Sequence, residues 1–75
     1  MIVIEDRKQM LMSVVKAAEF KRCSPLYIKA QLKKGVEWGE AIKISPNRWN
    51  YRIFTTKFLD SIGYPYRVDI KEETL

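Results

Sequence analysis

The sequence predicts a small α+β domain, and the prediction depends mainly on residues 23–53. The segment SPLYIKAQLKKG indicates a short helix, because Ser24 is a good N-cap, Pro25 suits the first helical position and Gly35 suits the C-terminal end. Two segments with alternating apolar residues follow, and the turn sequence SPN joins them. A helix followed by a β-hairpin in a chain of 75 residues indicates one compact α+β unit.

The predicted helix has a narrow core side and a basic, accessible side. At 100° per residue, Ile28 and Leu32 fall on one side of the helix. Six residues lie on the opposite side or on its flanks: Leu26, Tyr27, Lys29, Ala30, Lys33 and Lys34. We therefore expect this part of the helix to be free to contact a partner.

The predicted hairpin alternates apolar and polar residues along both strands. The apolar positions are Ile42, Ile44, Trp49, Tyr51 and Ile53. Each strand is therefore expected to have an apolar face and a polar face. A short basic helix followed by such a hairpin predicts a winged helix-turn-helix, in which the hairpin is the wing.

A further helix is predicted before this unit, and its start has two alternatives. It begins near Glu5, where acidic residues favour a helix N-terminus, or at Ser13, an acceptable N-cap that leaves residues 10–12 extended. The apolar residues expected in its core face are Leu11, Val14, Val15 and Ala18. Residues 1–4 form either a short strand or a frayed lead-in.

A last short helix is predicted over residues 54–63, with Thr55 or Thr56 as its cap and Gly63 at its end. Its apolar face consists of Phe58, Leu59 and Ile62. Residues 1–63 are then a single winged-helix domain, and residues 64–75 are a C-terminal tail that adds an edge strand or stays flexible.

The composition argues against several classes of protein. With one cysteine, Cys23, and no histidine, the chain has neither an internal disulfide nor the usual zinc-binding spacing. No catalytic motif or phosphate-binding glycine loop is present, so we expect no enzymatic activity and no cofactor. The opening MIVIEDRK is unlike a signal peptide, and no apolar run approaches the ~20 residues of a membrane helix. We expect a cytoplasmic protein that has no membrane partner.

The positive charge is concentrated in the middle of the chain. Residues 21–57 carry nine basic and two acidic side chains, whereas residues 1–20 are neutral and residues 58–75 carry a net charge of −2. The basic segment coincides with the predicted helix and wing. Such a distribution is typical of a surface that contacts phosphate groups.

The segments VVKAAEF, SPLYIKAQLKKG, GEAIKI, RWNYRI and TTKFLDSIG follow one another between Ser13 and Gly63. This order resembles the small winged-helix DNA-binding proteins of the excisionase/MerR-like type found in phages and mobile elements. The resemblance covers about two thirds of the chain. It implies a sequence-specific double-stranded DNA-binding protein, either an excisionase-like architectural factor or a small transcriptional regulator.

The resemblance also implies the partners, and the chemistry of the exposed residues predicts their roles on DNA. The partners are double-stranded DNA, an integrase or the transcription machinery, and further copies of the chain in a homodimer or a cooperative multimer. In the major groove, Leu26 and Ala30 meet thymine methyl groups and Tyr27 meets a base edge or a phosphate, while the helix lysines hold the backbone. Asn47 and Arg48, at the tip of the wing, reach the adjacent minor groove, where the arginine responds to groove shape.

Two other functions are compatible with the same sequence. A winged helix can present its helix and wing to a protein, which makes the chain an interaction adaptor. RNA binding is the lesser option, because the wing lacks paired solvent-facing aromatic residues for base stacking.

Overall fold

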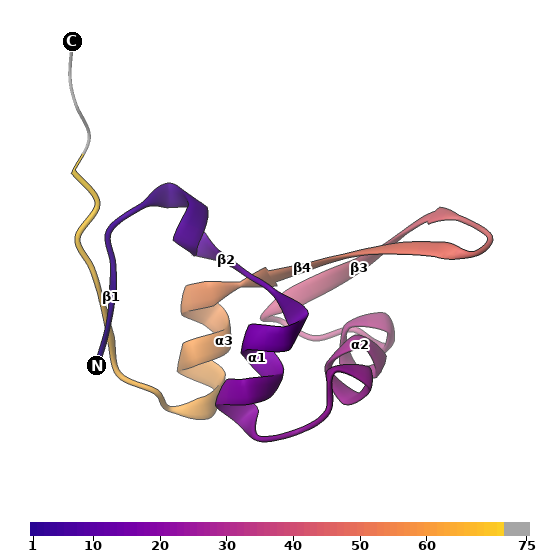
Figure 1. Ribbon diagram of the computed structural model, residues 1–75, viewed down its shortest axis with the longest axis horizontal. Coiled ribbons are helices and arrows are strands. Elements are labelled where there is room, and N and C mark those ends of the chain that lie inside the picture. Colours follow the sequence, from indigo (N-terminus) through magenta and orange to yellow (C-terminus); the bar gives the residue numbers. More distant parts are fainter. Residues whose placement is uncertain (72–75) are drawn as a thin grey trace, which may run out of the picture.

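The computed structural model describes residues 1–71 and has an α+β architecture (Figure 1). Its elements follow in the order β1 (Ile2–Ile4), the 3-10 helix η1 (Arg7–Met10), β2 (Leu11–Met12), α1 (Val14–Lys21), α2 (Pro25–Lys34), β3 (Gly39–Ser45), β4 (Arg48–Phe54), α3 (Thr55–Ile62) and β5 (Tyr66–Val68). The last four residues of the predicted tail, 72–75, lie outside the described residues.

Helix α1 begins at Val14, so the alternative with a helix start near Glu5 is wrong. Ser13 is the N-cap, and its Oγ accepts a hydrogen bond from the Lys16 N–H at 3.1 Å. The preceding residues form η1 instead, because Asp6 and Gln9 cap each other in a capping box. Strand β2 then pairs with β4, which holds residues 11–12 in an extended conformation.

The side of α1 that enters the core is narrower than the sequence predicts. Ala17 and Ala18 are buried against α2, whereas Val15 is 59% exposed. Val15 lies 100° around the helix from the half-buried Val14, which puts it outside the side that faces α2. Leu11, also expected in the core, is 53% exposed because it belongs to β2 and not to the helix.

Helix α2 matches its prediction at both ends and on its core side. The Ser24 Oγ accepts a hydrogen bond from the Tyr27 N–H at 3.2 Å, Pro25 opens the helix and Gly35 is the C-cap, with φ of 105°. Ile28 and Leu32 are the buried residues of the helix. Local capping signals were therefore sufficient to define this element.

The sheet β2-β4-β3 contains the predicted hairpin, but the apolar residues of its two strands lie on opposite faces. Ala41 pairs with Tyr51, and Lys43 pairs with Trp49, so these residues share the face that also carries the buried Ile53. Ile42 pairs instead with Asn50 and is 40% exposed. Directly opposed residues in an antiparallel pair point to the same face, so the register decides which residues are buried.

Helix α3 has the predicted apolar face but a different cap. Phe58 and Leu59 are buried, and Gly63 ends the helix in the left-handed conformation with φ of 70°. The N-cap is Phe54, without a side-chain hydrogen bond, so neither threonine is the cap. The Thr55 hydroxyl instead donates a 2.6 Å hydrogen bond to the Gln9 carbonyl, which links α3 to η1.

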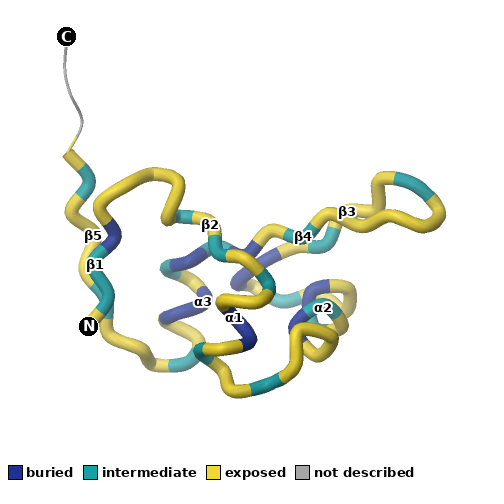
Figure 2. The backbone as a smooth tube through the Cα atoms, in the orientation of Figure 1, coloured by how far each residue is buried: buried dark blue, intermediate teal, exposed yellow. Residues whose placement is uncertain are grey.

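The core lies where the three helices meet the base of the hairpin (Figure 2). Trp38 is buried and packs edge-to-face on Phe58, with ring centroids 5.0 Å apart. On the other side of α3 and α1, β1 pairs in parallel with β5. Within residues 1–71, no helix is long and apolar enough to cross a membrane.

Strand β5 is joined to α3 by a side-chain contact. The Tyr66 hydroxyl donates a hydrogen bond to the Asp60 carboxylate at 3.1 Å. Desolvation, this hydrogen bond and the negative charge of Asp60 together raise the pKa of Tyr66 above its usual value of 10.0. Of the two alternatives for the tail, residues Tyr66–Val68 form the edge strand, because they pair with β1 as strand β5.

Candidate nucleic-acid interface

Helix α2 and the β3–β4 hairpin lie next to each other, at the end of the molecule away from the β1–β5 pair (Figure 1). All eight residues predicted to contact DNA belong to these two elements or to the turn between the strands. We call the surface formed by Leu26, Tyr27, Lys29, Ala30, Lys33, Lys34, Lys43, Trp49 and Tyr51 the helix–hairpin face; Asn47 and Arg48 lie beyond it, at the tip of the hairpin.

The α2 part of this face is accessible because the helix buries only its Ile28 and Leu32 side. Leu26 is 75% exposed and Tyr27 is 45% exposed. Ala30 and the last two lysines of the helix are also exposed, while Lys29 is half-buried toward the hairpin. An exposed leucine at the first turn of a helix is available for apolar contact with a partner.

Two lysines of α2 extend toward aromatic rings on β4. The Lys29 Nζ lies 5.6 Å from the centroid of the Tyr51 ring, and the Lys33 Nζ lies 5.0 Å from that of Trp49. On the neighbouring strand, the Lys43 Nζ lies 5.9 Å from the centroid of Trp49. These distances are within the range of cation–π attraction.

Within the described part of the chain, the lysines of the helix–hairpin face have no acidic partners. Among residues 1–71, no carboxylate forms an ion pair with Lys29, Lys33 or Lys43. The hairpin does contain one ion pair, between Arg52 and Glu40 at 3.7 Å, but the register puts it on the opposite face of the sheet. The helix–hairpin face therefore carries positive charge without local compensation.

Asn47 and Arg48 lie at the tip of the hairpin, where the turn meets β4, and both are exposed. Pairing shifts by one residue between Lys43 and Ser45, so the strand is irregular close to the tip. The hairpin extends past α2 (Figure 1), which leaves the tip residues free of contact with the helical core. The tip residues can therefore contact a part of a partner molecule that α2 does not contact.

From the sequence, Trp49 and Tyr51 were predicted only as apolar positions of the hairpin, and Lys43 was not among the predicted DNA contacts. Trp49 is 37% exposed and Tyr51 is half-buried, with lysines beside both rings. A signal was present: lysines four apart on the helix precede aromatic residues two apart on a strand. Its meaning depends on the packing of α2 against the hairpin, which no local pattern specifies.

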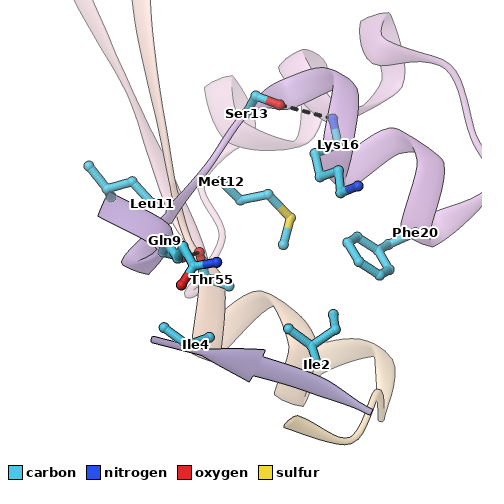
Figure 3. Close-up of a pocket in the computed structure, with 9 residues that line it drawn as sticks. All are labelled: Ile2, Ile4, Gln9, Leu11, Met12, Ser13, Lys16, Phe20 and Thr55. Atoms are coloured by element: carbon cyan, nitrogen blue, oxygen red, sulfur yellow. Dashed lines mark hydrogen bonds between the residues drawn. The ribbon is translucent and has the colours of Figure 1, made fainter. Parts of the chain in front are cut away.

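A hollow lies between β1, β2 and α1 and has a volume of about 430 Å³ (Figure 3). Ile2, Met12 and Phe20 direct apolar side chains into it, and Lys16 lies at its border with Nζ 5.7 Å from the centroid of the Phe20 ring. None of its lining residues is a carboxylate, histidine or cysteine. The lining of this hollow therefore supplies no carboxylate, imidazole or thiol for catalysis.

Metal binding has no candidate site in the part of the chain that the structure describes. No group of three or more His, Cys, Asp or Glu residues within residues 1–71 could hold an ion. Cys23 is a free, half-buried thiol that packs against the core between α1 and α2. The helix–hairpin face is thus the surface on which chemically distinctive residues gather.

Comparison with protein-family models, with curated proteins and with solved structures finds no match to this chain.

Proposed function

We propose that this protein binds double-stranded DNA in a sequence-specific manner, as an excisionase-like architectural factor or a small transcriptional regulator. In this proposal the α1, α2 and hairpin arrangement is a winged helix-turn-helix. Helix α2 enters the major groove and the hairpin is the wing that reaches the adjacent minor groove.

The observation that carries the proposal is the uncompensated charge of the helix–hairpin face. Lys29, Lys33 and Lys43 converge there from two elements, without a carboxylate partner within residues 1–71. Such a surface attracts phosphate groups and releases counterions when it binds them. The charge pattern of the sequence and the packing of α2 beside the hairpin support the same conclusion.

The shape of the two elements supports a division of roles. The major groove of B-DNA is about 12 Å wide and admits one α-helix. Exposed Leu26 and Ala30 then face thymine methyl groups, and Tyr27 faces a base edge or a phosphate. Arg48, at the tip of the hairpin, suits the negative potential of a narrow minor groove.

Fluorescence anisotropy of a labelled mixed duplex pool at two salt concentrations tests the proposal. The intact protein should bind with a log–log salt slope of about −0.9 for each phosphate contacted. The triple variant Lys29→Ala/Lys33→Ala/Arg48→Ala should bind about tenfold or more weakly and with a shallower slope, since it lacks phosphate contacts. Circular dichroism checks that the fold is retained.

A matched control variant distinguishes a binding surface from a general effect of charge. Lys8→Ala/Lys71→Ala/Arg67→Ala removes the same number of positive charges from η1, β5 and the residues after it, away from α2 and the hairpin. Its affinity should stay within about threefold of the intact protein. Absence of duplex binding by the intact protein at low salt contradicts the proposal.

A protein partner is the second candidate, and exposed apolar residues favour it. Leu26 is 75% exposed and Ile44 is 61% exposed, on the two elements that form the helix–hairpin face. Contacts of this kind bury apolar surface and depend weakly on salt. A partner retained at high salt, together with no binding of DNA, identifies the adaptor function.

A further inference from the structure

Helix α2 contacts β4 through two lysine–ring pairs, Lys29 with Tyr51 and Lys33 with Trp49, which we call rungs. Lys29 and Lys33 are four residues apart, so they lie on one side of the helix about 6 Å from each other. Tyr51 and Trp49 are two residues apart on one face of β4, at a spacing of about 7 Å. Because the two spacings match, each lysine reaches its own ring, with Nζ-to-centroid distances of 5.6 and 5.0 Å.

Each ring lies on the hairpin side of the α2 lysine that it contacts. Lys43 adds a second ammonium group to the Trp49 ring, which therefore contacts one lysine from α2 and one from β3. An ammonium group has three N–H donors, and a ring occupies only one side of it. The remaining donors of Lys33 and Lys43, both exposed, can still reach an oxygen ligand.

We propose that Trp49 and Tyr51 are positioning residues of the DNA-binding surface, which hold Lys29, Lys33 and Lys43 in a row for one phosphate strand of the duplex. This inference depends on the proposed function. A free lysine side chain has many rotamers, and ordering it opposes binding. In the free protein, the ring already restricts the lysine side chain, so less conformational entropy is lost when DNA binds. The ring attracts the ammonium group only weakly, so a phosphate can still bind that group.

A double-mutant cycle on duplex affinity tests the proposal, with anisotropy at one fixed low salt concentration as the readout. Trp49→Leu should weaken binding about fivefold, because two lysines lose their ring. The double variant Trp49→Leu/Lys33→Ala should bind at least about twofold more tightly than the product of the single effects predicts, since the ring acts partly through this lysine.

Lys34 supplies the matched control, because it is exposed on α2 and contacts no ring among residues 1–71. Trp49→Leu and Lys34→Ala should be additive, and Trp49→Phe should restore most of the affinity because it keeps an aromatic face. If Trp49→Leu lowers the helical signal in circular dichroism, Tyr51→Leu with Lys29→Ala provides the same cycle on the other rung.

The outcomes separate this inference from the function on which it depends. Steep, salt-dependent binding by the intact protein, with native affinity in Trp49→Leu or with additive effects in the Lys33 cycle, overturns the positioning role and leaves DNA binding in place. No duplex binding by the intact protein overturns both. Coupling in the Lys33 cycle but not in the Lys34 cycle supports the inference.

Discussion

Gly39 is a residue of β3 that packs closely against both β4 and α2. A Cβ atom at this position would lie 2.5 Å from the Arg52 carbonyl oxygen and 2.5 Å from the Leu32 Cδ2 atom. The first of these atoms belongs to the backbone of the paired strand and cannot move without disturbing the sheet. The absence of a side chain therefore sets the distance between α2 and the hairpin, and with it the lysine–ring contacts.

Gly39→Ala should lower the free energy of unfolding by about 3 kcal/mol, because overpacking forces the hairpin away from α2. Urea denaturation followed by circular dichroism measures this change. Gly63→Ala is the control: its φ of 70° is costly for alanine, but no atom lies within 4 Å of the added Cβ. It should lose only about 1 kcal/mol. Equal losses in the two variants would contradict the role assigned to close packing at Gly39.

At the scale of elements, β1 and β5 bring the two ends of the described chain together in a parallel pair. The Ile2 N–H donates to the Pro65 carbonyl at 3.2 Å, and the Asp69 N–H donates to the Ile4 carbonyl at 2.8 Å. Ile4 is 1% exposed although its strand has only three residues. The pairing therefore includes residues 66–68 in the folded unit.

A chain that ends at Gly63 should be less stable than one that ends at Lys71. Without β5, Ile4 loses its neighbouring strand and the backbone of β1 loses its partners. We expect a decrease of about 2 kcal/mol in the free energy of unfolding, comparable with the exposure of one large aliphatic side chain. Thermal and urea denaturation of the two chains measure the difference. Equal stability would mean that β5 contributes nothing to the fold.

At the scale of the whole molecule, the extents of 43 × 30 × 18 Å describe an elongated shape. The Cα radius of gyration is 13.6 Å, above the ~11 Å typical of a compact chain of this length. The hairpin contributes to this shape, since it extends past α2 while the core packs around its base (Figures 1 and 2). The base of the hairpin therefore packs into the core, while the outer part is the one that the proposed function assigns to DNA contact.

The outer part of the hairpin can be removed by replacing residues 42–50 with Asn-Gly. The two new residues then form the turn between Ala41 and Tyr51, which pair with each other in the hairpin. The shortened chain should lose at most about 1 kcal/mol of stability, because the removed residues are exposed or half-buried. Its duplex affinity should fall about tenfold or more, since Lys43, Arg48 and Trp49 are absent. Thermal denaturation and anisotropy measure the two effects. A large loss of stability would show that the outer hairpin supports the core.

The sequence by itself determined the elements whose signals are local. Ser24, Pro25 and Gly35 defined α2, Gly63 defined the end of α3, and a short turn sequence defined the hairpin. The buried side of α2 also followed from periodicity, because a helix with two large apolar residues on one side has one way to face the core. The basic character of the helix–hairpin face was visible from charge alone.

Only the tertiary structure decided the features that depend on distant partners. Pairing of β2 with β4 placed the start of α1 at Val14, and the hairpin register put Ile42 on the face opposite Tyr51. The sequence left open whether residues 1–4 and the start of the tail form strands, and β1 and β5 form because each supplies the backbone partner of the other. The lysine–ring rungs arise in the same way, from the distance between α2 and β4, which is a property of packing and not of either segment alone.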